Sequence, residues 1–253
     1  MSEKYDFVFV GGGHNALTCA GYLAKAGQSV IVLERRELVG GGVMTEEFTL
    51  PGFKHNDHSC MHEWIHVGPV YKDLELEKYG SKYIGYPELL GRCSIVWEDG
   101  SSLIWWQDPE RFAKDISYFS KKDAKTFLDL YYHWLSMGPL VSGLLFSPPI
   151  PPHEMDSRMY GTPEGRELMW LMRTSTENAL INYFESDKLI SLLGIMITQL
   201  GTNWDSLGTG AMLPAMTSAS HHMKLSVGGS IKLADAMCRF IEAHKGVVKN
   251  KSE

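Results

Sequence analysis

Short apolar runs separated by glycines dominate the first fifty residues. Residues 7–10 and 30–33 consist of valine, isoleucine, leucine and phenylalanine, a pattern typical of strands that are buried on both faces. Between these runs, residues 17–26 carry small or apolar side chains at helical spacing, and Gly27 ends this predicted helix. The residues on its apolar face are Leu17, Ala20, Gly21 and Ala24. The pattern therefore predicts a strand, a glycine turn, a helix and a second strand.

Helical periodicity dominates residues 70–225. Asp108 before Pro109 predicts the N-cap of one helix. Ser120 with Asp123 three positions later resembles a capping box and predicts the start of a second helix. The proline-rich segment 147–152 predicts a break in the helical region. A hairpin is expected around Asp99-Gly100, and further helices are expected at 164–173, 188–200 and 231–243.

The predicted helices of this middle region are rich in methionine and aromatic residues. Two interpretations remain open, because flexible methionines suit both a cavity for a bulky apolar substrate and an ordinary helical core. The residues concerned are Tyr131, Tyr132, Trp134, Met169, Trp170, Met172, Met196, Met212, Met216 and Met223.

The glycine turn carries the clearest chemistry in the chain. Gly11 permits a tight turn, Gly13 allows the backbone to approach a pyrophosphate, and Ala16 permits close packing of the helix on the strand. The helix N-terminus then offers free N–H groups and a positive dipole end to phosphates. Glu34 closes the second strand, where an acidic residue accepts hydrogen bonds from the adenosine ribose. These features together predict a dinucleotide site.

A second glycine-rich segment, Gly40-Gly41-Gly42, follows Glu34-Arg35-Arg36. This arrangement resembles the second motif of the FAD-dependent amine-oxidase and phytoene-desaturase superfamily. Residues 45–53 with Asp57 are similar to the phytoene-dehydrogenase-related branch, and the Gly-Gly pair at 228–229 resembles a later element of it. One difference is Gly42, where many relatives have arginine.

The resemblance implies an α/β fold in which a Rossmann-like FAD-binding domain accompanies a largely helical substrate domain. It implies FAD as the cofactor. The residues expected to hold it are Gly11, Gly13, His14, Asn15, Ala16, Glu34, Arg35, Arg36, Gly41, Gly42 and Val43.

Residues 55–66 are rich in histidine, and three interpretations are open. If the segment is helical, His58, His62 and His66 fall on one face, where they could bind a metal. The resemblance places the segment near the flavin ring, where His58 and His62 are candidate catalytic residues. The third interpretation is a polar helix without a special role. We assign no metal site.

Composition limits the remaining classes of function. A net charge of −6 argues against nucleic-acid binding. Four scattered cysteines predict reduced thiols. The polar start of the chain does not resemble a signal peptide, and no apolar run has the length of a membrane span. We therefore expect a cytoplasmic protein without a transmembrane segment.

The predicted parallel sheet contains few strands. Residues 247–248 form a third candidate strand after 7–10 and 30–33, and three strands would leave an apolar edge unpaired. The resemblance implies relatives of about twice this length, so we expect a second protein chain to complete the flavin fold. The expected domains are 1–69 with 226–253 for FAD binding, and 70–225 for substrate and interactions.

The preferred hypothesis is an FAD-binding subunit of an oxidoreductase that transfers a hydride from an apolar or alicyclic substrate to flavin. Two alternatives remain open. One is a non-catalytic subunit that holds FAD or supports assembly, and the other is a redox-neutral flavin-dependent isomerase. The sequence does not identify the substrate, the electron acceptor or an acid–base residue.

Overall fold

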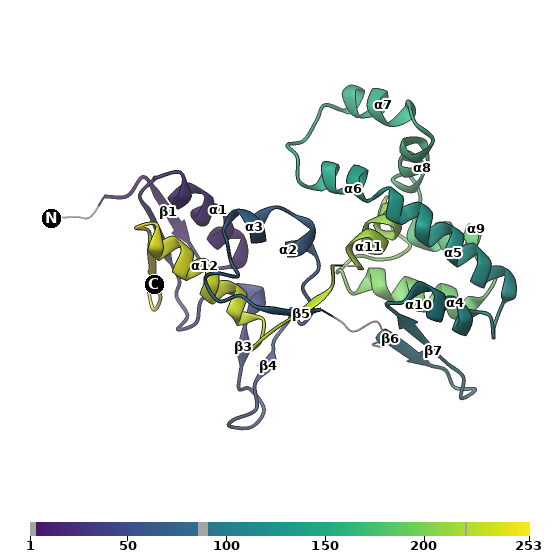
Figure 1. The fold of residues 1–253 in the computed structure, drawn as a ribbon, viewed down its shortest axis with the longest axis horizontal. Coiled ribbons are helices and arrows are strands. Elements are labelled where there is room, and N and C mark those ends of the chain that lie inside the picture. Colours follow the sequence, from purple (N-terminus) through teal and green to yellow (C-terminus); the bar gives the residue numbers. More distant parts are fainter. Residues whose placement is uncertain (1–3, 86–90, 221) are drawn as a thin grey trace. The chain divides into compact units, whose positions relative to one another are not determined.

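The computed structural model describes residues 4–85, 91–220 and 222–253, which divide into two units (Figure 1). Unit 1 comprises residues 1–85 and 222–253, and unit 2 comprises residues 86–221. The predicted polar start at residues 1–3 lies outside the described residues. None of the helices in the described ranges has the length and apolar composition needed to cross a membrane.

A parallel sheet with the strand order β1–β2–β9 forms the centre of unit 1. Its strands are β1 (Phe7–Val10), β2 (Val30–Leu33) and β9 (Val247–Lys249). Phe7 pairs with Val30 across the first ladder, and Ile31 pairs with Val247 across the second. The three predicted strands are therefore confirmed, although most of the chain separates the second from the third.

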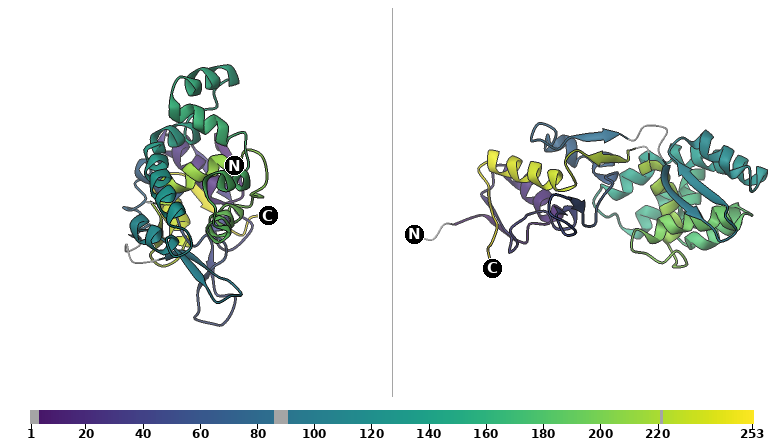
Figure 2. Two further views of the ribbon diagram at one scale, coloured as in Figure 1. Left: turned by 90° about the vertical axis from the view of Figure 1, so that its right-hand side faces the viewer. Right: turned by 90° about the horizontal axis from the view of Figure 1, so that it is seen from below.

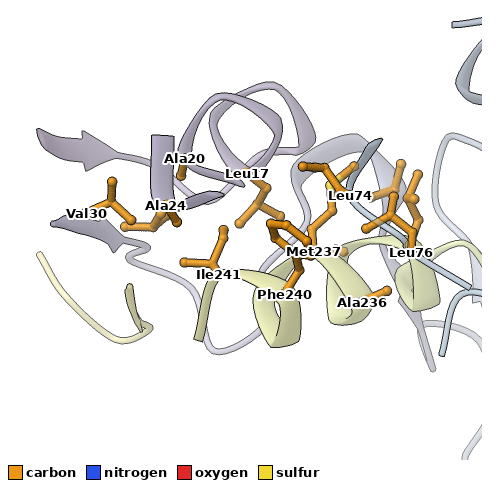
Figure 3. Packing of buried hydrophobic residues seen from close by; sticks show 14 residues of the cluster. Leu17, Ala20, Ala24, Val30, Leu74, Leu76, Ala236, Met237, Phe240 and Ile241 are labelled. Atoms are coloured by element: carbon orange, nitrogen blue, oxygen red, sulfur yellow. The ribbon is translucent and has the colours of Figure 1, made fainter. Parts of the chain in front are cut away.

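Two helices cover one face of this sheet. Helix α1 (His14–Lys25) packs against α12 (Ile231–Ala243), and Figure 1 and Figure 2 show the two helices side by side. Val30 and Val32 of β2 point into the same core and are fully buried. Figure 3 shows this packing. The other core residues are Leu17, Ala20, Ala24, Val43, Leu74, Leu76, Leu233, Ala234, Ala236, Met237, Phe240 and Ile241.

The opposite face of the sheet is mostly apolar, and its β1 side chains are uncovered. Val8 and Val10 are 58% and 93% exposed, so the prediction that β1 is buried on both faces is wrong. Successive side chains of a strand point to opposite faces, and both packed helices lie on the face of Val30 and Val32. We call the other face the open face; by register it consists of Val8, Val10, Ile31, Leu33, Val247 and Lys249.

The rest of unit 1 consists of short elements. A 3₁₀ turn, η1 (Gly41–Val43), leads into the antiparallel pair β3 (Thr45–Glu46) and β4 (His55–Asn56). Helices α2 (Trp64–Val67) and α3 (Val70–Asp73) follow. The antiparallel pair β5 (Tyr83–Gly85) and β8 (Lys224–Ser226) joins the point where the chain leaves unit 1 to the point where it returns.

Unit 2 combines one hairpin with a helical bundle. The hairpin predicted around Asp99-Gly100 is confirmed as β6 (Gly91–Val96) and β7 (Ser102–Trp106). The proline-rich break predicted at 147–152 separates α6 (Gly138–Leu145) from α7 (Pro152–Tyr160), and its last residue, Pro152, begins α7. The helices are α4 (Pro109–Ile116), α5 (Lys121–Ser136), α6 (Gly138–Leu145), α7 (Pro152–Tyr160), α8 (Pro163–Leu171), α9 (Thr176–Tyr183), α10 (Asp187–Thr198) and α11 (Met212–Ser220), with the 3₁₀ turn η2 (Thr209–Ala211) before α11.

Two predicted helix starts in unit 2 are confirmed, and one of them has an unexpected partner. Asp108 caps α4 by accepting from the N–H groups of Glu110 and Arg111. Ser120 caps α5 by accepting from Asp123 N–H. The Asp123 carboxylate does not complete a capping box. It is fully buried and accepts from the backbone N–H groups of residues 185 and 186, just before α10.

Most methionine and aromatic side chains of unit 2 form its core. Tyr131, Trp134 and Met196 are nearly fully buried, whereas Tyr132 and Trp170 are 50% and 41% exposed. A cavity among these core side chains has a volume of about 20 Å³, enough for one water molecule. Within unit 2, these residues therefore form a packed core and do not line a cavity of substrate size.

Candidate functional site

The predicted glycine turn connects β1 to α1. Gly11 has a φ of 97°, a conformation that glycine adopts without strain, and its N–H donates to Leu33 O at 2.7 Å. Gly12 is buried, and an added Cβ there would lie 2.6 Å from Val39 Cγ1. Gly13 is the N-cap of α1. The turn thus directs the chain from the end of the strand into the helix.

The N-terminus of α1 is open to a ligand. Gly13 provides no side-chain cap, and an added Cβ on Gly13 would meet nothing within 4 Å. His14 and Asn15 in the first turn are exposed, and Ala16 is half-buried. An uncapped helix N-terminus presents N–H groups and a partial positive charge, which suit a phosphate group. The open space at Gly13 fits the backbone approach that a pyrophosphate requires.

Glu34 lies at the opposite side of the turn, at the end of β2. Its Oε2 accepts from Gly12 N–H at 2.7 Å and its Oε1 accepts from Arg36 N–H at 2.9 Å. The Arg36 N–H lowers the pKa of the Glu34 carboxyl, against the opposing effect of burial and with support from the Gly12 N–H. The carboxylate is therefore ionised at neutral pH. A carboxylate has about four acceptor sites, so it can also accept from ribose hydroxyls.

The second glycine segment packs directly against the first. Gly13 and Gly40 form a parallel bridge, and an added Cβ on Gly41 would lie 3.0 Å from Gly13 Cα. Gly41 has a φ of 58° and is exposed, and Gly42 lies beside His14. Any side chain at 41 would separate the two backbones. The two glycine segments therefore form one continuous backbone surface.

Three other expected cofactor residues lie around this surface in different environments. Arg35 is exposed. Arg36 pairs with Glu46 of β3 through Nη2 and Oε1 at 2.8 Å. The side chain of Val43 is 5% exposed and lies in the core, while its N–H donates to Gly40 O. Val43 therefore shapes the glycine segment, and its N–H is already used within that segment.

The histidines of residues 55–66 do not share a helical face. Only Trp64–Val67 is helical, and β4 occupies His55–Asn56, so the condition for stacking His58, His62 and His66 is not met. His58 is exposed, whereas His62 is 5% exposed. In the parts of the chain that the structure describes, no group of three histidine, cysteine or acidic side chains could hold a metal ion.

His62 belongs to a buried cluster with Tyr83 of β5. The His62 Nδ1 and the Tyr83 hydroxyl are hydrogen-bonded at 2.7 Å, and the His66 ring packs edge-on against Tyr83 with the centroids 4.4 Å apart. Burial lowers the pKa of His62 to about 4, and the charge of His14 contributes to this shift. His62 is therefore neutral at pH 7. Its Nε2 is buried without a hydrogen-bond partner.

Two residues of this site have no clear signal in the sequence. Gly12 is the glycine whose N–H binds Glu34, although the motif spacing draws attention to its two neighbours. The presence of three consecutive glycines was the available signal for Gly12. Tyr83 reaches His62 only because β5 pairs with the distant β8, and the His62 backbone pairs with Lys224 of that strand.

Comparisons with known proteins agree with this geometry. Residues 10–73 match the NAD(P)-binding Rossmann-like domain family. The chain is 30% identical over 241 residues to one of the subunits of limonene dehydrogenase from Castellaniella defragrans, and the match covers 94% of this chain and 43% of that protein. The chain therefore spans less than half of the length of this relative.

Solved structures of amine oxidases share the fold. A putrescine oxidase variant matches 98% of this chain and 50% of its own with a TM-score of 0.60 and 20% identity. Cyclohexylamine oxidase from Brevibacterium oxydans matches 98% of this chain and 51% of its own with a TM-score of 0.57 and 16% identity. The Rossmann-like part and the remaining residues thus follow the architecture of one half of these oxidases.

Proposed function

We propose that this chain, which combines a Rossmann-like nucleotide-binding domain with the fold of the amine oxidases, is the FAD-binding part of a flavin-dependent oxidoreductase. The observation that carries this proposal is the pairing of open space at Gly13 with an ionised, buried carboxylate at Glu34. The open helix N-terminus at Gly13 suits a phosphate, and the Glu34 carboxylate suits the hydroxyls of a ribose. The homology to a dehydrogenase subunit supports an oxidoreductase over other nucleotide-binding proteins.

The residues of the chain would each perform a physical task. The N-terminus of α1 and the surface of the two glycine segments bind the pyrophosphate, and Glu34 accepts from the ribose hydroxyls. When bound, the flavin would accept a hydride from the substrate. Glu34 also holds Gly12 N–H, so the same carboxylate fixes the shape of the turn. The remaining expected cofactor residues surround this centre, with His14 and Asn15 at the exposed first turn.

The substrate we propose is apolar or alicyclic. The relative matched over 94% of this chain is named for limonene, a cyclic hydrocarbon without charged groups. Residues 86–221 of unit 2 would contribute to substrate binding. A cavity of about 380 Å³ lies among residues 139–162 of this unit, whereas the cavity in its methionine-rich core has only about 20 Å³.

A second protein chain is the partner we propose. The matched relative is itself named as one subunit of a dehydrogenase, and β1 is an edge strand whose outer side has no strand beside it in the described sheet. Val8 and Val10 expose apolar surface next to that edge. Unpaired strand edges with apolar side chains normally bind another strand or are covered. The partner would pair with β1 and cover the open face.

A titration with flavin tests the cofactor assignment. The wild-type chain, purified with its partner where one copurifies, should bind FAD with quenching of flavin fluorescence, and Glu34→Ala should weaken this binding by roughly ten- to a hundredfold, the effect of losing a charge-assisted hydrogen bond. Glu37→Ala is the matched control, because Glu37 is exposed and pairs with Lys251. Binding of NAD in place of FAD, or equal FAD affinity in both variants, would contradict the proposal.

The reaction requires a separate measurement. Anaerobic addition of limonene or a related cyclic hydrocarbon to the FAD-loaded complex should bleach the visible flavin absorption and yield an oxidised product. A product at the same oxidation level would select the isomerase alternative. Stable flavin binding without bleaching by any hydrocarbon, and without product, would select the alternative of a non-catalytic subunit.

A further inference from the structure

His62 combines two features that are rarely found together. Its side chain is only 5% exposed, yet Nε2 has no hydrogen-bond partner. A buried polar atom without a partner destabilises the folded protein, and native proteins contain few of them. A ligand that is absent from the structure would supply the missing partner.

The position of His62 indicates which ligand this is. The segment before it is attached to the second glycine segment, because Ser59 N–H donates to Gly42 O at 3.2 Å. Gly42 in turn lies beside His14, the first residue of α1, and His14 is close enough to His62 to act on it electrostatically. His62 therefore lies three residues from a contact with the glycine surface and within electrostatic range of the first residue of α1.

The contact with Tyr83 allows Nε2 to be a hydrogen-bond donor, because a tyrosine hydroxyl can donate as well as accept. Burial raises the pKa of the Tyr83 hydroxyl, so this group keeps its proton and can donate to His62 Nδ1 at 2.7 Å. A neutral imidazole carries one proton. With Nδ1 accepting, that proton lies on Nε2, and Nε2–H is a donor without an acceptor.

The ring of His62 is held firmly in this orientation. Its backbone exchanges two hydrogen bonds with Lys224 of β8, at 2.9 and 3.1 Å. Tyr83 is immobilised in turn by edge-on contacts with the rings of His66 and Tyr71, with centroids 4.4 and 5.5 Å away. A donor fixed in this way before the ligand binds loses little entropy on binding.

We propose that His62 is a positioning residue for the flavin nucleotide, and that its Nε2–H donates a hydrogen bond to an oxygen acceptor of that ligand. This inference rests on the proposed function. The acceptor is an oxygen of the diphosphate or of the flavin ring. Tyr83 acts through His62 by fixing the proton on Nε2.

Affinity measurements on three variants test the proposal. His62→Leu removes the donor and should weaken FAD binding by roughly tenfold or more. His62→Gln retains an N–H donor and should recover part of the affinity. His153→Leu is the matched control, because His153 is an exposed histidine of unit 2, and it should bind FAD as the wild-type chain does. Melting temperatures without ligand verify that each variant is folded.

Titration with ADP distinguishes the two acceptors. If the acceptor is a diphosphate oxygen, His62→Leu should weaken the binding of ADP and of FAD by the same factor. If the acceptor is on the flavin ring, only FAD binding should weaken. Both results support a donor role for His62, whereas equal affinity of wild type and His62→Leu for both ligands would overturn it.

Nitrogen NMR of the full-length chain gives a result that does not depend on the leucine variant folding. We expect the His62 imidazole to carry its proton on Nε2 in the free protein, and the Nε2 resonance to move when FAD is added. A proton on Nδ1, or an unchanged resonance in the FAD-loaded protein, would overturn the inference alone. If the wild-type chain binds no FAD at all, the proposed function itself fails.

Discussion

Two adjacent glycines in the turn after β1 have different surroundings. An added Cβ on Gly12 would lie 2.6 Å from Val39 Cγ1 and 3.2 Å from Glu34 Cβ, whereas one on Gly13 would meet nothing within 4 Å. Gly12 is therefore required by the packing of the protein itself. Gly13 leaves space at the N-terminus of α1, where only a ligand would be affected by a side chain.

Alanine substitutions should separate these two requirements. Gly12→Ala should destabilise the free protein by about 1–3 kcal/mol, as overpacking of a tight site does. Gly13→Ala should change the stability by less than about 1 kcal/mol, because the φ of −70° and ψ of 160° at this N-cap suit alanine, but it should weaken FAD binding. Thermal unfolding and FAD titration of both variants test this. Equal loss of stability in the two variants would contradict it.

The histidines near Tyr83 make stability depend on pH. Burial lowers the pKa of His62 and of His66 to about 4, whereas unfolded histidine has a pKa of about 6.5. Below pH 6.5 the unfolded chain binds protons that the folded chain does not. The contribution of His62 to the free energy of unfolding should therefore fall by roughly 3 kcal/mol between about pH 6.5 and pH 4, and this contribution should level off below that range.

Denaturant unfolding between pH 7 and pH 4 measures this dependence. The His62→Gln variant should show a shallower fall than the wild-type chain, since glutamine does not titrate. The same slope in both proteins would show that His62 does not contribute, whatever the absolute stability of the variant.

Gly11, Gly13 and Glu34 could be proposed as cofactor-binding residues from the sequence, because their signal is local. Gly11, Gly13 and Glu34 follow each other at fixed spacings within one βαβ unit. The environment of His62 was not predictable in this way. The helix assumed for residues 55–66 is replaced by short elements, and Tyr83 reaches His62 through the pairing of β5 with β8, strands that are distant in sequence.

At the scale of elements, the residues at which helices begin were predicted better than the burial of the strands. The caps at Asp108 and Ser120 depend on neighbouring residues, so short-range patterns identify them. The burial of β1 depends on what covers each face of the sheet. A run of apolar residues such as Phe7–Val10 has the same pattern whether both faces are covered or only one, and the sequence of the strand does not distinguish the two cases.

Asp123 shows how one side chain connects two elements. Its buried carboxylate joins α5 to the backbone before α10. Asp123→Ala should leave two partly buried N–H groups without their acceptor and destabilise the chain by about 1–3 kcal/mol per group at most. Asp129→Ala on the exposed side of α5 is the control and should have an effect below about 0.5 kcal/mol. Urea unfolding compares them, and similar effects would argue against the link.

At the scale of the whole molecule, the open face governs how the chain behaves alone. Its apolar side chains next to the unpaired edge of β1 favour association. The wild-type chain, purified alone, should self-associate and bind a hydrophobic dye such as ANS. Val8→Lys should reduce both effects, because it places a charge on the open face.

Val96→Lys is the matched control for this prediction. Val96 lies in β6 of unit 2 and is 73% exposed, so a lysine there should leave self-association and dye binding unchanged. Sedimentation velocity and dye fluorescence measure both effects. A wild-type chain that is monomeric and binds no dye would contradict the role assigned to the open face.

The strand order of unit 1 also has a consequence for synthesis on the ribosome. The sheet takes its third strand from Val247–Lys249, whereas residues 86–221 of unit 2 form one continuous stretch. Unit 2 is therefore complete in the nascent chain before β9 and α12 have been translated. Domains commonly fold during translation in the order of their synthesis. Here the N-terminal βαβ unit cannot complete its sheet until β9 has been synthesised. Limited proteolysis of stalled nascent chains should therefore find unit 2 protected while β1 and β2 are still cleaved.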